Sequence, residues 1–190
     1  SLSITGNLTI ETWVKFESIG SEGYVGLVSK GTNDVVRRSY LFAQQANAGD
    51  DKLSLFVSAD GETSEILQVT WNPSTATWYH VAVTWTAATS TAKFYVDGSQ
   101  QGADQVGVVT SIRNSDIGLE LGGDNFGVNM LDGQLDDVRI WNVIRTGTEI
   151  NNNKSIELVG NESGLAAYWP FETDLGGAGV VTEDDFTIIF

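Results

Sequence analysis

The sequence predicts an all-β domain: a two-sheet antiparallel β-sandwich with one short helical turn. Stretches of alternating apolar and polar residues recur about every 8 to 15 residues, and turn residues such as Gly, Asn and Asp separate them. The pattern contains only one short helical stretch. The chain has 190 residues, of which 41% are hydrophobic, so it can build one large β domain with a substantial core.

The first half of the chain contains six strand-like stretches. In residues 8–16, Leu8, Ile10 and Val14 share one face, because side chains alternate along a strand. A hairpin turn is expected at Asp60–Gly61. The other five stretches are residues 23–30, 39–45, 52–59, 64–71 and 77–85.

The second half continues the same pattern. Residues 91–98 end in Asp97–Gly98, the clearest hairpin signal in the chain, and residues 116–123, 132–141 and 165–171 are further strands. A helical turn is expected from Thr146 to Asn153, with Thr146 or Thr148 as its N-cap. The sandwich therefore occupies residues 1–175. Residues 176–190 form a Gly-rich and acidic tail that ends in the strand-like run FTIIF.

Residues 132–141 carry the most informative pattern. Val138 and Ile140 share one strand face, and Arg139 and Trp141 share the other. Gly133 permits a turn or bulge before the strand, and the acidic pair Asp136–Asp137 begins it. A carboxylate at this position can reach an ion or a neighbouring loop.

The charge balance excludes some partners. The formal net charge is −15, from 10 basic and 25 acidic residues. Nucleic acids and anionic membrane surfaces attract Lys and Arg, so neither is an expected partner, whereas Asp-rich loops suit hard divalent cations. No apolar run approaches the roughly 18 residues that a membrane span needs. The sequence contains no cysteine, and its Thr/Ser/Asn/Gly-rich composition is typical of exported proteins, so we expect an extracellular or cell-surface location.

No catalytic residues are evident. Hydrolysis of a glycosidic bond needs a pair of carboxyl groups, and no strand carries alternating acidic residues in the pattern E-x-D-x-E or E-x-D-x-x-E. The single histidine, His80, lies inside a strand and is expected to be a structural residue hydrogen-bonded between the sheets.

Four blocks, GNLTIETWVK, WYHVAVTW, FYVDG and DGQLDDVRIW, occur in an order that resembles the laminin G-like branch of the concanavalin A-like lectin/glucanase superfamily. The resemblance covers Ser3 to Phe171 and implies a jelly-roll fold. In these relatives an acidic residue at the start of the last block helps to hold structural calcium, a role that the resemblance assigns to Asp136.

A second calcium candidate comes from the stretch LGGDNFGVNM, which resembles the calcium loop of the pentraxins. Asp124 matches the acidic residue of that loop, and Asn33–Asp34 match an Asp–Asn pair from an earlier loop. Gly122–Gly123 replace the Glu–Gln that precedes this residue in pentraxins, which removes two side-chain ligands. The metal-site candidates are therefore Asp136, Asp124, Asn33 and Asp34, with Ca²⁺ as the ion.

Aromatic side chains near loops or strand ends could stack on sugar rings. The candidates are Tyr24, Tyr40, Trp71 and Phe126, together with the adjacent Asn125. The other five tryptophans lie inside strand patterns and are expected in the core.

Three functions fit these observations. The first is a non-catalytic recognition module that binds a glycan or a cell-surface partner, with calcium assistance. The second is a structural module of a bacterial surface appendage or large adhesin. Relatives begin with a strand that precedes Ser1. Either this strand has been trimmed, or the FTIIF run or another chain fills that sheet edge, and filling by another chain would allow self-assembly. The third is a glycan-active enzyme.

Overall fold

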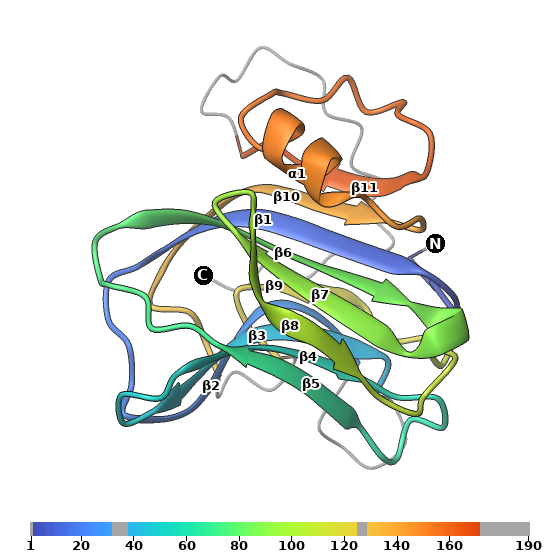
Figure 1. Ribbon diagram of the computed structural model, residues 1–190, viewed down its shortest axis with the longest axis horizontal. Coiled ribbons are helices and arrows are strands. Elements are labelled where there is room, and N and C mark those ends of the chain that lie inside the picture. The colour runs from blue at the N-terminus through green and yellow to red at the C-terminus, as the bar shows by residue number, and fades with distance from the viewer. Residues whose placement is uncertain (1, 32–37, 125–128, 172–190) are drawn as a thin grey trace.

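The computed structural model describes residues 2–31, 38–124 and 129–171. Two antiparallel sheets pack face to face, as the sequence predicts (Figure 1). The six-stranded sheet has the order β11-β10-β1-β6-β7-β8, with β1 (Leu8–Phe16), β6 (Trp78–Thr86), β7 (Thr91–Val96), β8 (Ser99–Val106), β10 (Gly133–Trp141) and β11 (Leu165–Trp169). The five-stranded sheet has the order β5-β4-β3-β2-β9, with β2 (Glu22–Lys30), β3 (Tyr40–Asn47), β4 (Lys52–Val57), β5 (Glu65–Thr70) and β9 (Leu119–Leu121).

Alternation along the strands builds the core. Leu8, Ile10 and Val14 of β1 face the inside of the sandwich with no exposed surface, and Leu53 and Leu55 of β4 meet them from the other sheet. The faces that the sequence predicts for β1, β6, β7 and β10 are therefore confirmed. Burial of these large apolar side chains is the main stabilising contribution to the fold.

Strand β10 is an inner strand of its sheet, paired with β1 on one side and with β11 on the other. The edge strands of this sheet are β11 and β8. The FTIIF run lies outside the described residues, so strand addition at a sheet edge stays a prediction. A bulge at Asp137, whose φ is 49°, lets Leu135 and Val138 both face the core.

The predicted turn and helix are also present. Asp97 and Gly98 have φ values of 50° and 82°, the left-handed pair that a two-residue hairpin requires. The helix α1 (Gly147–Asn153) begins at Thr146, whose side chain accepts a hydrogen bond from the Glu149 N–H while the Glu149 side chain bonds back to Thr146. This capping box identifies Thr146 as the N-cap. A short 3-10 turn, η1 (Ala87–Thr89), joins β6 to β7.

Residues 142–164, which include α1 and which we call the cap, cover the outer face of the six-stranded sheet at β10, β1 and β6 (Figure 1). Arg139 of β10 donates hydrogen bonds to the Asn153 and Ile156 carbonyls, at 2.8 and 2.7 Å. The indole N–H of Trp13 donates to the Lys154 carbonyl at 2.7 Å. These donors satisfy carbonyls at and just after the helix C-terminus, which fixes the cap on the sheet.

His80 is buried beneath this cap and not between the two sheets, so the predicted environment is wrong. Its ring packs edge-on against Trp13, with centroids 5.4 Å apart, and neither imidazole nitrogen makes a hydrogen bond. The reason is strand parity: Val81 and Val83 face the core, and therefore His80 and Ala82 face outward.

Among the described residues, no helix has the length and apolar character needed to cross a membrane.

Candidate functional site

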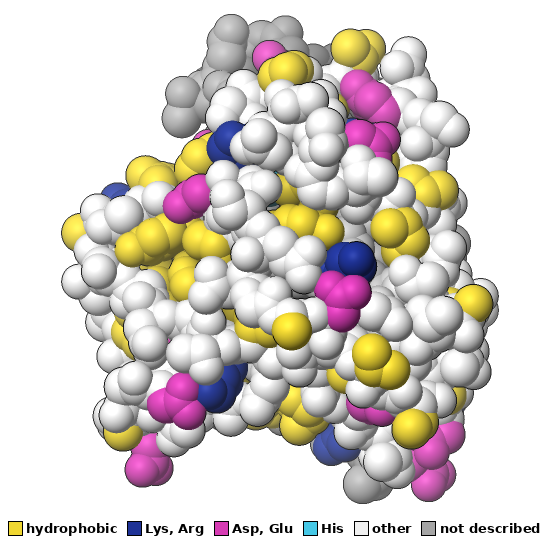
Figure 2. Space-filling model, viewed as in Figure 1, with side chains coloured by type: hydrophobic (Ala, Val, Ile, Leu, Met, Phe, Trp, Pro, Cys, Tyr) yellow, Lys and Arg dark blue, Asp and Glu magenta, His cyan; other side chains and the backbone are white. Residues whose placement is uncertain are grey.

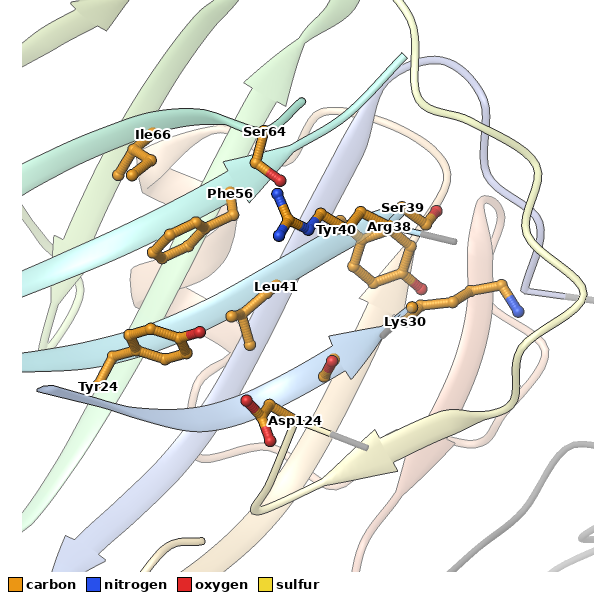
Figure 3. Close-up of a pocket in the computed structure, with 12 residues that line it drawn as sticks. Tyr24, Lys30, Arg38, Ser39, Tyr40, Leu41, Phe56, Ser64, Ile66 and Asp124 are labelled. Atoms are coloured by element: carbon orange, nitrogen blue, oxygen red, sulfur yellow. The ribbon is translucent and has the colours of Figure 1, made fainter. Parts of the chain in front are cut away.

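A pocket of about 260 Å³ opens on the outer face of the five-stranded sheet (Figure 3). Its lining comes from β2, β3, β4, β5 and the loop after β9. The lining residues are Tyr24, Ser29, Lys30, Gly31, Arg38, Ser39, Tyr40, Leu41, Phe56, Ser64, Ile66 and Asp124.

The floor of the pocket is an apolar row that crosses three strands. Leu41, Phe56 and Ile66 are direct cross-strand neighbours on β3, β4 and β5. Because Leu55 and Val57 point into the core, Phe56 between them must point outward. Ile66 is 51% exposed, so the row is an apolar surface that the fold leaves in contact with solvent.

Two aromatic rings stand on this surface. Tyr24 of β2 and Phe56 of β4 have ring centroids 5.5 Å apart and are tilted by 42°. Ala43 and Ser54 lie between their rows on the same outer face, yet both are completely buried. The two rings therefore form a continuous aromatic surface over the middle of the sheet, a geometry that favours contact with a flat apolar group.

Polar groups border the aromatic surface. Arg38 donates to the Glu62 carbonyl at 3.2 Å, and Ser64 adds a hydroxyl group beside it. Ser39 also lines the pocket, but it is buried and its hydroxyl donates to the Arg113 carbonyl at 2.8 Å. At the other side lies Asp124, which is 3% exposed and accepts a hydrogen bond from the Asn129 side chain. The pocket thus offers both donors and acceptors around an apolar centre, which is the usual composition of a small-ligand site.

Gly26 allows the loop that carries Asp124 to approach the sheet. A Cβ atom at Gly26 would lie 2.1 Å from the Gly123 carbonyl oxygen, so no other residue fits there without moving the loop. The Gly26 N–H also donates to the Asn129 carbonyl at 3.1 Å. A glycine inside a strand is typical of such a close backbone approach.

Of the predicted sugar-contacting residues that the structure describes, only Tyr24 offers a ring at the pocket surface. Tyr40 borders the pocket, but it is 2% exposed and its side chain belongs to the core. Trp71 is 6% exposed and packs between Phe16 and Tyr79, with ring centroids 6.0 and 5.5 Å away. Because both side chains are buried in the core, neither ring is exposed for contact with a sugar. Asn125 and Phe126 lie outside the described residues.

The two predicted calcium candidates lie in different parts of the fold. Asp124 lines the pocket on the outer face of the five-stranded sheet, whereas Asp136 lies on the outward face of β10 in the other sheet. Stacked sheets are about 10 Å apart, so one ion cannot contact both carboxylates. Asn33 and Asp34 lie outside the described residues. Within the parts of the chain that the structure describes, no group of three or more His, Asp or Glu side chains is arranged to hold a metal ion.

Asp136 makes local hydrogen bonds at the bulge. Its carboxylate accepts a hydrogen bond from the Asp137 N–H at 2.8 Å, and partial burial raises its pKa. Its backbone carbonyl accepts the Thr12 hydroxyl at 3.0 Å. These contacts stabilise the bulge between β1 and β10.

Phe56, Leu41 and Ile66 were not identified from the sequence. The signal that could have found Phe56 is its parity in KLSLFV, where Leu53, Leu55 and Val57 alternate with it. A large aromatic residue at an outward position of a strand indicates an exposed apolar surface.

A second group of ionisable residues, Glu11, His80 and Arg139, lies under the cap and is at most 1% exposed. Burial raises the pKa of Glu11 to about 7 and lowers the pKa of His80 to about 3. Because no ligand can reach this group in the folded state, its role is structural.

On the face shown in Figure 2, the Lys and Arg side chains of the described residues lie singly and do not form a basic patch. With a formal net charge of −15, this distribution does not suit a phosphate backbone.

Comparisons with known proteins agree with the architecture. A family model described as the concanavalin A-like lectin/glucanases superfamily matches residues 1–151. No curated protein sequence matches the chain significantly.

Several solved structures have the same fold. A candidate carbohydrate-binding protein from Bacteroides ovatus is 23% identical with a TM-score of 0.65, and the match covers 87% of this chain and 45% of that one. The CBM40 of the Ruminococcus gnavus IT-sialidase, bound to α2,3-sialyllactose, is 17% identical with a TM-score of 0.61, covering 80% and 84%. A heptameric SAP-like pentraxin from Limulus polyphemus is 14% identical with a TM-score of 0.54, covering 77% and 69%. The chain therefore spans less than half the length of the Bacteroides ovatus protein.

Proposed function

The chain belongs to the concanavalin A-like lectin/glucanase superfamily, and on this basis we propose that it is a carbohydrate-binding module whose site is the pocket on the outer face of the five-stranded sheet. Superfamily membership alone does not define an activity, because one fold carries many functions. The proposal therefore depends on the chemistry of the pocket.

The observation that carries the proposal is the aromatic surface formed by Tyr24 and Phe56. The C–H face of a sugar ring is apolar and flat, and it packs well on aromatic rings. The sugar hydroxyl groups extend from the edge of the ring, where Asp124, Arg38 and the Ser64 hydroxyl border the pocket. An apolar centre with a polar border matches this distribution of groups.

The similarity to the Bacteroides ovatus protein and to the sialidase module supports the proposal, because both are described as binding carbohydrate. At 23% and 17% identity these similarities show the fold alone. The sugar specificity therefore depends on the residues of this pocket.

We propose binding without hydrolysis. Hydrolysis of a glycosidic bond needs two carboxyl groups, about 5 to 9.5 Å apart, on either side of that bond. Asp124 is the single acidic residue among the described residues that line the pocket, so the second carboxyl group is lacking there.

The test is a glycan array with the wild-type chain, followed by calorimetric titration of the best ligand. Phe56→Ala and Tyr24→Ala should each reduce affinity about ten-fold or more, because each removes a large contact surface. Trp78→Ala is the matched control: Trp78 is an exposed aromatic residue on the other sheet, and its loss should leave affinity unchanged. Unchanged affinity in both pocket variants would refute this site, and turnover of the bound glycan would refute binding without hydrolysis.

We also propose an exported location and a contribution of calcium near Asp124. The Thr/Ser/Asn/Gly-rich composition without cysteine supports the exported location, and the place of Asp124 beside the pocket supports the contribution of calcium. Titration of the chelator-treated protein with calcium, followed by glycan binding, tests the second one. Binding that is equal with and without calcium would refute it.

A further inference from the structure

A second hollow, of about 310 Å³, lies directly beside the pocket. Residues of the β4–β5 turn, the start of β5 and the segment after β8 line it, among them Ala59, Thr63, Glu65 and Val108. Ser64 lines both the pocket and this hollow. The two depressions are therefore neighbours that share one wall at the start of β5.

The walls of the second hollow are held rigidly. The Glu65 carboxylate accepts hydrogen bonds from the N–H groups of Val108 and Val109, at 2.6 and 3.0 Å, and from the Ser90 hydroxyl at 3.0 Å. Gly107 donates its N–H to the Ser90 carbonyl at 2.8 Å, and a Cβ atom at Gly107 would lie 2.2 Å from the Glu65 carboxylate. The segment that carries Val108 is thus clamped by a carboxylate.

The opposite wall is held in the same way. The Asp60 carboxylate accepts the N–H groups of Glu62 and Thr63, at 2.8 and 2.9 Å, and the Ser58 hydroxyl at 3.1 Å. Because these walls are already ordered before binding, less conformational entropy is lost when a ligand binds.

Val108 is 85% exposed although its backbone is fixed on both sides. The core does not use this side chain, so it presents a fixed apolar contact at the edge of the hollow. The Ser64 and Thr63 side chains supply hydroxyl groups opposite it. Like the pocket, the hollow therefore combines an apolar contact with polar groups, which is the combination that suits a sugar ring.

We propose that this hollow is a second sugar subsite, so that the chain binds an oligosaccharide that extends from the aromatic pocket across the start of β5 to Val108. This inference rests on the proposed carbohydrate-binding function. Ligand sites usually measure about 300–1,000 Å³, and the 260 Å³ pocket alone lies below that range. The neighbouring hollow, which shares Ser64 with the pocket, measures about 310 Å³, so a ligand that occupies both has a site well within the range.

The test uses Val108→Asp in the full chain, with calorimetric titration of a defined panel of mono-, di-, tri- and tetrasaccharides that includes α2,3- and α2,6-sialyllactose. For the wild type, affinity should rise about ten-fold or more from the shortest bound saccharide to its extended form. Val108→Asp should remove this gain and leave the affinity for the shortest saccharide unchanged. Val159→Asp is the matched control, because Val159 is 82% exposed on the cap and its replacement should change neither affinity.

A second measurement reports on the hollow directly. In methyl NMR spectra, the Val108 signals should shift with the extended saccharide and stay in place with the shortest one. If Phe56→Ala abolishes binding while affinity is independent of saccharide length and of Val108→Asp, the second subsite is refuted and the proposed function stands. If no saccharide in the panel or on the array binds, both are refuted.

Discussion

Replacement of Glu11 by Gln should change how the stability of the protein depends on pH. Glu11 of β1 lies beside Arg139 of β10 and has its Oε2 atom 3.5 Å from Nε2 of His80. At this distance an ion pair could form, but burial opposes charge on both groups. Burial raises the pKa of Glu11 to about 7, although Arg139 and Arg145 lower it, and the Asp137 carboxylate also raises it.

Burial, with Arg139 and Lys154, lowers the pKa of His80 to about 3. Both groups are therefore expected to be neutral between about pH 4.5 and 6.5. The stability that neutral Glu11 contributes is fully present below its ordinary pKa of 4.5 and is lost as the pH rises through about 7. One pKa unit corresponds to about 1.4 kcal/mol, so the loss amounts to about 3 kcal/mol.

His80 acts in the opposite direction. Its contribution is present above its ordinary pKa of 6.5 and is lost as the pH falls toward 3. Because His80 is retained in Glu11→Gln, the difference between the two unfolding curves isolates Glu11. As the pH rises from 4.5 to 7.5, the free energy of unfolding of the variant should increase by about 3 kcal/mol relative to that of the wild type.

The assay is urea unfolding, followed by tryptophan fluorescence, at half-unit pH steps from 4.5 to 8. Glu157→Gln, which removes an exposed carboxylate of the cap, is the control and should give a curve parallel to that of the wild type. A free-energy difference between Glu11→Gln and the wild type that does not vary with pH would refute the reasoning.

Four further predictions concern stability and metal binding. Gly98→Val should lower the free energy of unfolding, measured in urea, by more than about 1 kcal/mol, because Gly98 has a φ of 82° and a Cβ atom there would crowd α1. Gly49→Val is the control: Gly49 has a similar φ but open space around it, so the loss of stability should be smaller. Thr146→Ala should cost about 1 kcal/mol through loss of the helix N-cap, measured as a lower Tm. Trp85→Ala should cost about 3–5 kcal/mol by cavity formation, and a loss under about 1 kcal/mol would contradict its place in the core. Calcium at a hundred times its Kd should add about 2.7 kcal/mol and Asp124→Asn should abolish this gain, whereas a melting curve unchanged by chelator would refute calcium binding.

Several features of the fold could be predicted from the sequence because they are local. Alternation along residues 132–141 assigns Val138 and Ile140 to the core face, and the structure confirms this. The Asp97–Gly98 turn and the Thr146 capping box depend only on residues close in sequence. Strand β8 is not evident in the sequence, because this edge strand is largely exposed on both faces and lacks apolar alternation.

The candidate site could be predicted only in part. The sequence analysis included Tyr24 and Asp124 among the candidate residues, and both line the pocket. It placed Trp71 there as well, although Trp71 packs in the core. Phe56 was missed, since alternation alone does not show whether an outward face is covered.

The sequence by itself determined which side chains share a strand face, because the two-residue repeat of a strand depends only on local backbone geometry. Only the tertiary structure decided what lies against each face. The cap covers the outer face of the six-stranded sheet and buries His80 and Arg139, whereas the outer face of the five-stranded sheet stays open at Phe56. Likewise Asp124 and Asp136 are close in sequence, but they lie at different sheets, because β9, which precedes Asp124, pairs with β2 whereas β10, which carries Asp136, pairs with β1. Such contacts depend on packing between segments far apart in the chain, which no local pattern specifies.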